Sequence, residues 1–120
     1  MSPVKHPVSG PELTFSLAEE MASLRRELRN VPARSAKTLI KEGAVTVTLI
    51  GVNAGGSLHA HKAEGPITVQ VLEGEIEFAV GETSRALPAG TLLALDGGIT
   101  HAVHSAHGAM FLLTVVNVPG

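Results

Sequence analysis

From Ala36 onward, apolar and polar residues alternate with a period of two, and this pattern constrains the fold more than any other feature. Such alternation is typical of half-buried β-strands, because successive side chains point to opposite faces. The runs Val45 to Leu49 and Ile76 to Val80 are clear examples. Turn residues such as Glu73-Gly74 and Pro88-Ala89-Gly90 separate one run from the next. About eight short strands at regular spacing predict an all-β fold.

The chain before these strands has a helical pattern. Ser16 and Glu19 form a capping box at the start of a predicted helix over residues 16–29. One apolar stripe runs along it, formed by Leu17, Met21, Leu24 and Leu28. We therefore expect an N-terminal arm over residues 1–15, a helix and linker over residues 16–35, and a barrel over residues 36–120.

Composition narrows the fold and the function classes. A length of 120 residues suits one domain, and with the strand pattern it favours a small double-sheet barrel of jelly-roll type. The net charge is -2, no basic block is present and aromatics are scarce, so we expect neither nucleic acid nor a membrane as partner. The lack of cysteine excludes disulfides and thiolate metal sites. We see no secretory signal or membrane-spanning run and expect a cytoplasmic protein.

Three histidines at two places form the strongest candidate site. His59 and His61 are two residues apart, so on a regular strand they point to the same face. His101 follows a double-glycine turn two strand-like runs later. If the strand of His101 neighbours the strand of His59 and His61, the three imidazoles converge on one point. A metal bound there would keep open coordination positions, as metals that bind a substrate require. We predict that His59, His61 and His101 bind a divalent transition metal, which could be Fe, Zn, Ni or Mn.

Two other interpretations of these histidines stay open. They are surface residues near loop ends, or they line a pocket that binds no metal. His104 is out of phase with His101, so we expect it on the outer face, and His107 falls in a turn before Gly108.

The stretch from Gly55 to Val118, roughly half of the chain, resembles the cupin superfamily. The residues that fit its two motifs are His59, His61 and Gly74 in the first, and Gly90, Gly98 and His101 in the second. The resemblance implies a small, single-domain, RmlC-like cupin, which is a double-stranded β-helix or jelly-roll barrel, here with one short N-terminal helix.

Several positions depart from the family's motifs. Ile67 stands where the family has its glutamate ligand, and Asn53, Asp96 and Ser105 replace a glycine, a proline and an asparagine. The resemblance then implies a three-histidine centre without a carboxylate, as in some cupin dioxygenases that use ferrous iron. Two residues could restore a fourth ligand. For Glu64 we favour a solvated loop position, and for Gln70 the face opposite Ile67.

The resemblance implies a small metal-binding cupin whose substrate the sequence does not assign. One hypothesis is a three-histidine metal-dependent oxygenase, or a related enzyme, acting on a small polar or anionic molecule. The alternative is a non-catalytic module that binds or senses a metal or a small molecule. The expected pocket is lined by Ile67, Val69, Phe78 and Val103. We also expect a homodimer, because one strand face that we place outside is partly apolar: Ala44, Thr46, Thr48, Ile50 and Val52.

Overall fold

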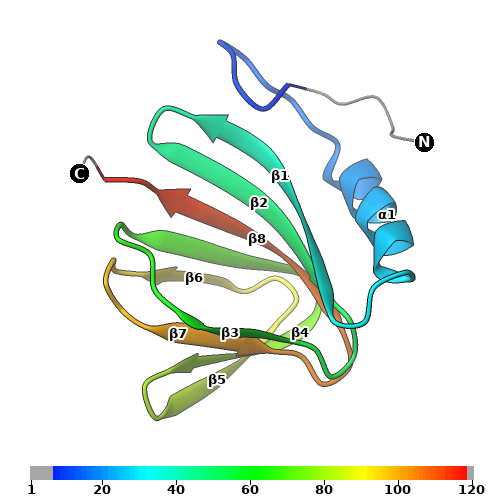
Figure 1. The fold of residues 1–120 in the computed structure, drawn as a ribbon, viewed down its shortest axis with the longest axis vertical. Helices are drawn as coiled ribbons and strands as arrows, with labels where there is room; N and C mark the ends of the chain where they lie inside the picture. The colour runs from blue at the N-terminus through cyan, green and yellow to red at the C-terminus, as the bar shows by residue number, and fades with distance from the viewer. Residues whose placement is uncertain (1–6, 119–120) are drawn as a thin grey trace.

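The computed structural model describes residues 7–118, which form one helix and eight strands (Figure 1). In chain order they are α1 (Leu17–Leu28), β1 (Arg34–Glu42), β2 (Val45–Val52), β3 (Ser57–His61), β4 (Ile67–Val80), β5 (Thr83–Pro88), β6 (Leu92–Leu95), β7 (His101–His104) and β8 (Ala109–Val116). The predicted all-β fold with one short N-terminal helix is confirmed.

The long strand β4 connects the two layers of the fold. Its first part pairs with β8 and β6, and its second part, from Glu75, pairs with β7 and β5. Neighbours follow the order β1-β2-β8-β4-β7-β3, and the sheet curls into a half-barrel (Figure 1). The prediction that Glu73-Gly74 ends a strand is wrong. A register shift between Val71 and Glu73 and a φ of 75° at Gly74 instead bend one strand from layer to layer.

The curled sheet has an apolar core on its inner side and a helix on its outer side. The inner core consists of Ile50, Val52, Ile67, Val69, Val71, Ile76, Phe78, Leu87, Val103, Ala109 and Phe111. A second cluster lies between α1 and the sheet and contains Leu24, Leu28, Leu39, Leu49 and Met110. Full burial of one such side chain stabilises the fold by about 1.5–3 kcal/mol, so both clusters contribute substantially.

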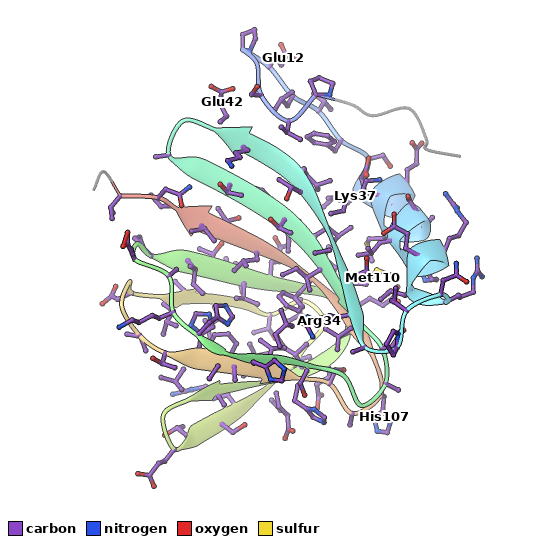
Figure 2. The ribbon with its side chains drawn as sticks, viewed as in Figure 1. Glu12, Arg34, Lys37, Glu42, His107 and Met110 are labelled. Carbon is purple, nitrogen blue, oxygen red and sulfur yellow. The ribbon has the colours of Figure 1, made fainter. Side chains whose placement is uncertain are left out.

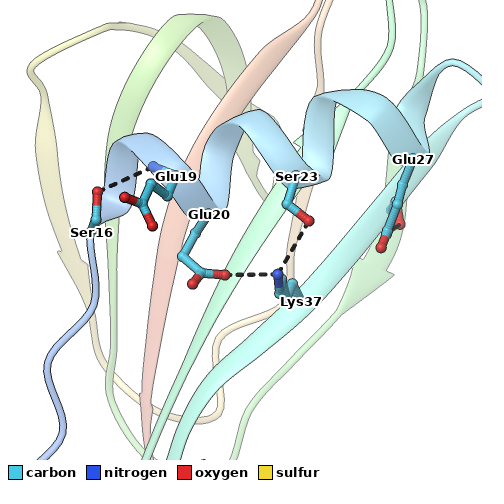
Figure 3. Close-up of polar contacts among 7 residues, drawn as sticks. Ser16, Glu19, Glu20, Ser23, Glu27 and Lys37 are labelled. Carbon is cyan, nitrogen blue, oxygen red and sulfur yellow. Dashed lines mark hydrogen bonds and ion pairs between the residues drawn. The ribbon is translucent and has the colours of Figure 1, made fainter. Parts of the chain in front are cut away.

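Polar contacts cap the start of α1 and attach the helix to β1. Ser16 is the N-cap, and its Oγ accepts a hydrogen bond from the backbone N–H of Glu19, as the capping box predicts. Lys37 of β1 lies 2.8 Å from Oε1 of Glu20 and donates to Oγ of Ser23 (Figure 3). These charged side chains are only 26% and 12% exposed, so water screens the pair less than a fully exposed one.

The strand face used to predict a homodimer is not the outer one. Ile50 and Val52 belong to the inner core, because β2 presents its threonine-bearing face to the inside and Leu49 to the helix. The homodimer stays a prediction, as does the cytoplasmic location. No helix within residues 7–118 is long and apolar enough to cross a membrane.

Candidate functional site

The register of β3 and β7 brings two of the three predicted ligands together. His61 is the antiparallel partner of His101, and their ring centroids are 4.4 Å apart with an interplanar angle of 60°. His101 is 5% exposed, whereas His61 is exposed at the end of β3. One imidazole is therefore anchored in the core, and the other lies where a ligand can reach it.

The two imidazoles have the same hydrogen-bond arrangement. Nδ1 of His61 donates to the carbonyl oxygen of His59 at 2.8 Å, and Nδ1 of His101 donates to that of Ile99 at 3.0 Å. A carbonyl oxygen can only accept, so each neutral ring carries its proton on Nδ1. Each Nε2 then has a free lone pair, and neither has a hydrogen-bond partner among residues 7–118.

Both rings border a small cavity on the inner side of the sheet. Its volume is about 20 Å³, and apolar side chains form the rest of its lining: Ile50, Leu58, Val69, Phe78, Val103, Phe111 and Leu113. Phe78 stacks on His101, with centroids 5.4 Å apart and planes at 15°. The space accommodates about one water molecule or one metal ion. Of the predicted pocket residues, Ile67 is buried in the same core but does not line this cavity.

His59 does not join the pair, because β3 contains a bulge. His59 and Ala60 together stand opposite the single residue Ala102 of β7, so the alternation of side chains is broken there. Leu58 and His61, on either side of the bulge, both border the inner cavity. His59 is exposed and lines a hollow on the outer face of the sheet instead. The prediction that His59 and His61 share one face is wrong in this structure.

Among the described residues, no further ligand approaches the pair. Within residues 7–118, no three His, Cys, Asp or Glu side chains lie close enough together to hold a metal ion. Glu64 is exposed in the loop after β3, and Gln70 is exposed on the face of β4 opposite the core. His104 shares a hydrogen bond of 2.9 Å with Oγ of Ser57, and His107 lies exposed in the turn before β8 (Figure 2). The described donor set therefore consists of two imidazoles.

The sequence matches no protein-family model and no curated protein. Its fold, by contrast, resembles solved structures. A conserved protein of unknown function from Streptococcus pyogenes superposes with a TM-score of 0.67 at 22% identity, over 72% of this chain and 76% of that chain. A cupin superfamily protein from Desulfitobacterium hafniense superposes with a TM-score of 0.69 at 16% identity, over 71% of this chain and 78% of that chain. An RmlC-like cupin from Shewanella frigidimarina superposes with a TM-score of 0.67 at 17% identity, over 72% of this chain and 78% of that chain. The chain has the cupin fold.

Two residues that depart from the cupin motifs, Ser105 and Asn53, form hydrogen bonds to the backbone in this chain. Ser105 is fully buried, and its Oγ donates to the carbonyl oxygen of Glu75 at 2.7 Å and accepts from the backbone N–H of Gly108. Nδ2 of Asn53 donates to the carbonyl oxygens of Leu28 and Val31, each at 2.9 Å, just past α1. From the sequence alone, both residues are evident only as substitutions in the motifs. Their one local signal was a short polar side chain beside a turn, which often bonds to backbone.

Proposed function

We propose that this chain binds one divalent transition metal through Nε2 of His61 and Nε2 of His101. The observation that carries the proposal is the pair of hydrogen bonds from Nδ1 to carbonyl oxygens, because they leave both Nε2 lone pairs available. Metal-binding histidines generally have this arrangement, in which the other ring nitrogen donates to a carbonyl or carboxylate and orients the ring.

The distance between the two rings supports the same proposal. Two imidazoles bound through Nε2 at about 2.1 Å have centroids about 4.6 Å apart when the angle at the metal is about 90°. The observed separation of 4.4 Å is close to this value. The cavity of about 20 Å³ suits an ion better than an organic molecule. Imidazole donors suit Zn, Fe, Ni and Mn, so the residues present fit such an ion.

The two histidines would leave several coordination positions open. A bound ion supplies Lewis acidity, or a site for dioxygen if it is redox-active, to a small molecule that binds at those positions. His101 is fixed in the core by its contact with Phe78, while the exposed His61 lies toward the entry. The apolar side chains around His101 would shield a bound ion from water on its inner side, which would strengthen its electrostatic effect on a ligand.

A calorimetric metal titration of tag-free protein tests the proposal. We expect about one Zn²⁺ per chain. Removing a group that hydrogen-bonds to a metal ligand already weakens metal binding 10- to 100-fold. Removing the ligand itself, in His61→Ala or His101→Ala, should therefore weaken it about a hundredfold or more. His59→Ala and the control His107→Ala, each of which removes an exposed imidazole, should bind as the wild type does.

Two results of that titration would contradict the proposal. Failure of the wild type to bind Zn²⁺, Fe²⁺, Ni²⁺ or Mn²⁺ would overturn it. A loss in His59→Ala as large as in His61→Ala would show that His59 is a ligand and that the bulge at Ala60 rearranges when the metal binds.

A non-catalytic binding module is the second candidate, and the lining of the cavity favours it. Apart from the two imidazoles, the described lining is entirely apolar, so no carboxylate, amine or hydroxyl lies ready to transfer a proton. Ligands of such a module would raise its melting temperature without being converted. Formation of a product with the metal-loaded protein would favour the enzyme instead.

A further inference from the structure

A cleft much larger than the histidine cavity lies between β5 and β6. Both strands pair with β4, but no pairing joins them to one another in the described chain, so the barrel is open at this point. The resulting cleft has a volume of about 590 Å³, which is within the range of small-molecule sites. Phe78 lines this cleft as well as the cavity at His61 and His101. The cleft is thus separated from the proposed metal site by one aromatic ring.

The cleft is apolar except at three side chains. The apolar part of its lining includes Phe78, Val80, Leu87, Leu93 and Leu95. Thr83, Arg85 and Thr91 are the polar residues, and Arg85 is the one charged residue among the described lining. A ligand that fills this space therefore meets apolar walls and a single positive charge.

Arg85 points to the inner face of the sheet. Its antiparallel partner on β4 is Phe78, and directly opposed residues of neighbouring strands share one face. Phe78 is 1% exposed in the inner core, so Arg85 lies on the inner face of β5, where it is exposed and lines the cleft. Within residues 7–118, Arg85 has no ion pair and no side-chain hydrogen bond. A cation on the inner wall, without a carboxylate beside it, is available to pair with a ligand.

We infer that the β5–β6 cleft binds a small monocarboxylate with an apolar body, held by Arg85. The planar guanidinium matches a carboxylate through two parallel hydrogen bonds. A single cation balances one negative charge, which favours a carboxylate over a doubly charged phosphate ester. The leucines and valine on the walls contact the apolar body. This site does not depend on a metal at His61 and His101.

Octanoate and its uncharged analogue octanamide are suitable probes, used with wild-type protein in the presence of a chelator. We expect octanoate to bind at least about tenfold more tightly than octanamide, because hydrogen bonds to charged groups contribute that much. Arg85→Gln should weaken octanoate binding about tenfold or more and leave octanamide binding unchanged. Arg26→Gln, which removes an exposed arginine of α1, is the matched control and should have no effect.

Methyl NMR of the same samples locates the ligand, and we expect chemical-shift changes at Leu87, Leu93 and Leu95. The dispersion of the same spectra shows whether each variant is folded. Any of three results would overturn the inference: no octanoate binding, equal affinity for octanamide, or equal losses in Arg85→Gln and Arg26→Gln. The chelator removes metal from these samples. The octanoate result is therefore independent of whether the calorimetric titration shows metal binding at His61 and His101.

Discussion

Gly74→Ala should destabilise the protein by about 3 kcal/mol or more, because overpacking and backbone strain add at this position. Gly74 has a φ of 75°, a conformation that L-residues rarely adopt. A Cβ atom there would also meet the carbonyl oxygen of Gly108 and the Cα of Ala109. Both are backbone atoms, one in the turn before β8 and one in the first residue of β8, so they cannot move aside as a flexible side chain does. Urea denaturation measures the loss directly.

Gly81→Ala is the matched control for this experiment. Gly81 also has a positive φ, of 60°, but a Cβ added there would have no atom within 4 Å. Its substitution should cost only about 1 kcal/mol, the strain of the backbone alone. Equal losses in the two variants would show that the close approach at Gly74 does not hold the bend in β4.

Phe78→Ala should cost about 3–5 kcal/mol in the free energy of unfolding, as expected for truncation of a buried aromatic ring. Phe78 is 1% exposed and packs in the inner core. The ring also separates the histidine cavity from the β5–β6 cleft, so its removal joins the two spaces. We therefore expect a large decrease in melting temperature together with weaker octanoate binding.

Phe111→Ala separates these two effects. Phe111 is 2% exposed and lines the histidine cavity, but it does not line the cleft. Its truncation should destabilise the protein by a similar amount, about 3–5 kcal/mol, while octanoate binding persists in the folded fraction. A loss below about 1 kcal/mol for Phe78→Ala would mean that its ring is not part of a close-packed core.

Local patterns predicted the helix and the all-β character of this fold. The period of two predicts the strands because a half-buried strand must alternate, and the Ser16 cap with its apolar stripe predicts α1. Both signals depend on residues close together in the chain. The pairing of His61 with His101 was a hypothesis from spacing, and the antiparallel register of β3 and β7 brings them together.

The errors arose where distant strands decide the conformation. His59-Ala60-His61 is compatible with a regular strand, and only the register shift against β7, between Leu58 and His61, shows the bulge that moves His59 to the outer face. Glu73-Gly74 is a common turn pair, yet strands on both sides of β4 keep the chain extended through it. Tertiary context overrides such local signals when the pairing strands supply hydrogen bonds that a turn would lose.

The choice between the two faces of β2 failed for a related reason. One face carries Val45, Val47 and Leu49, and the other carries Ile50 and Val52 beside two threonines. Both faces are partly apolar because α1 covers one and the barrel interior covers the other. Alternation separates two faces but cannot say which is inside when both are covered.

Long-range ¹H–¹⁵N correlation spectra of the histidine rings test the central claim, that His61 and His101 present free Nε2 atoms to a metal. In metal-free protein, both rings should carry their proton on Nδ1. Addition of Zn²⁺ should shift the Nε2 signals of His61 and His101 and leave those of His59 and His107 unchanged. Protons on Nε2 in the metal-free protein, or Nε2 signals of His61 and His101 that do not respond to Zn²⁺, would contradict it.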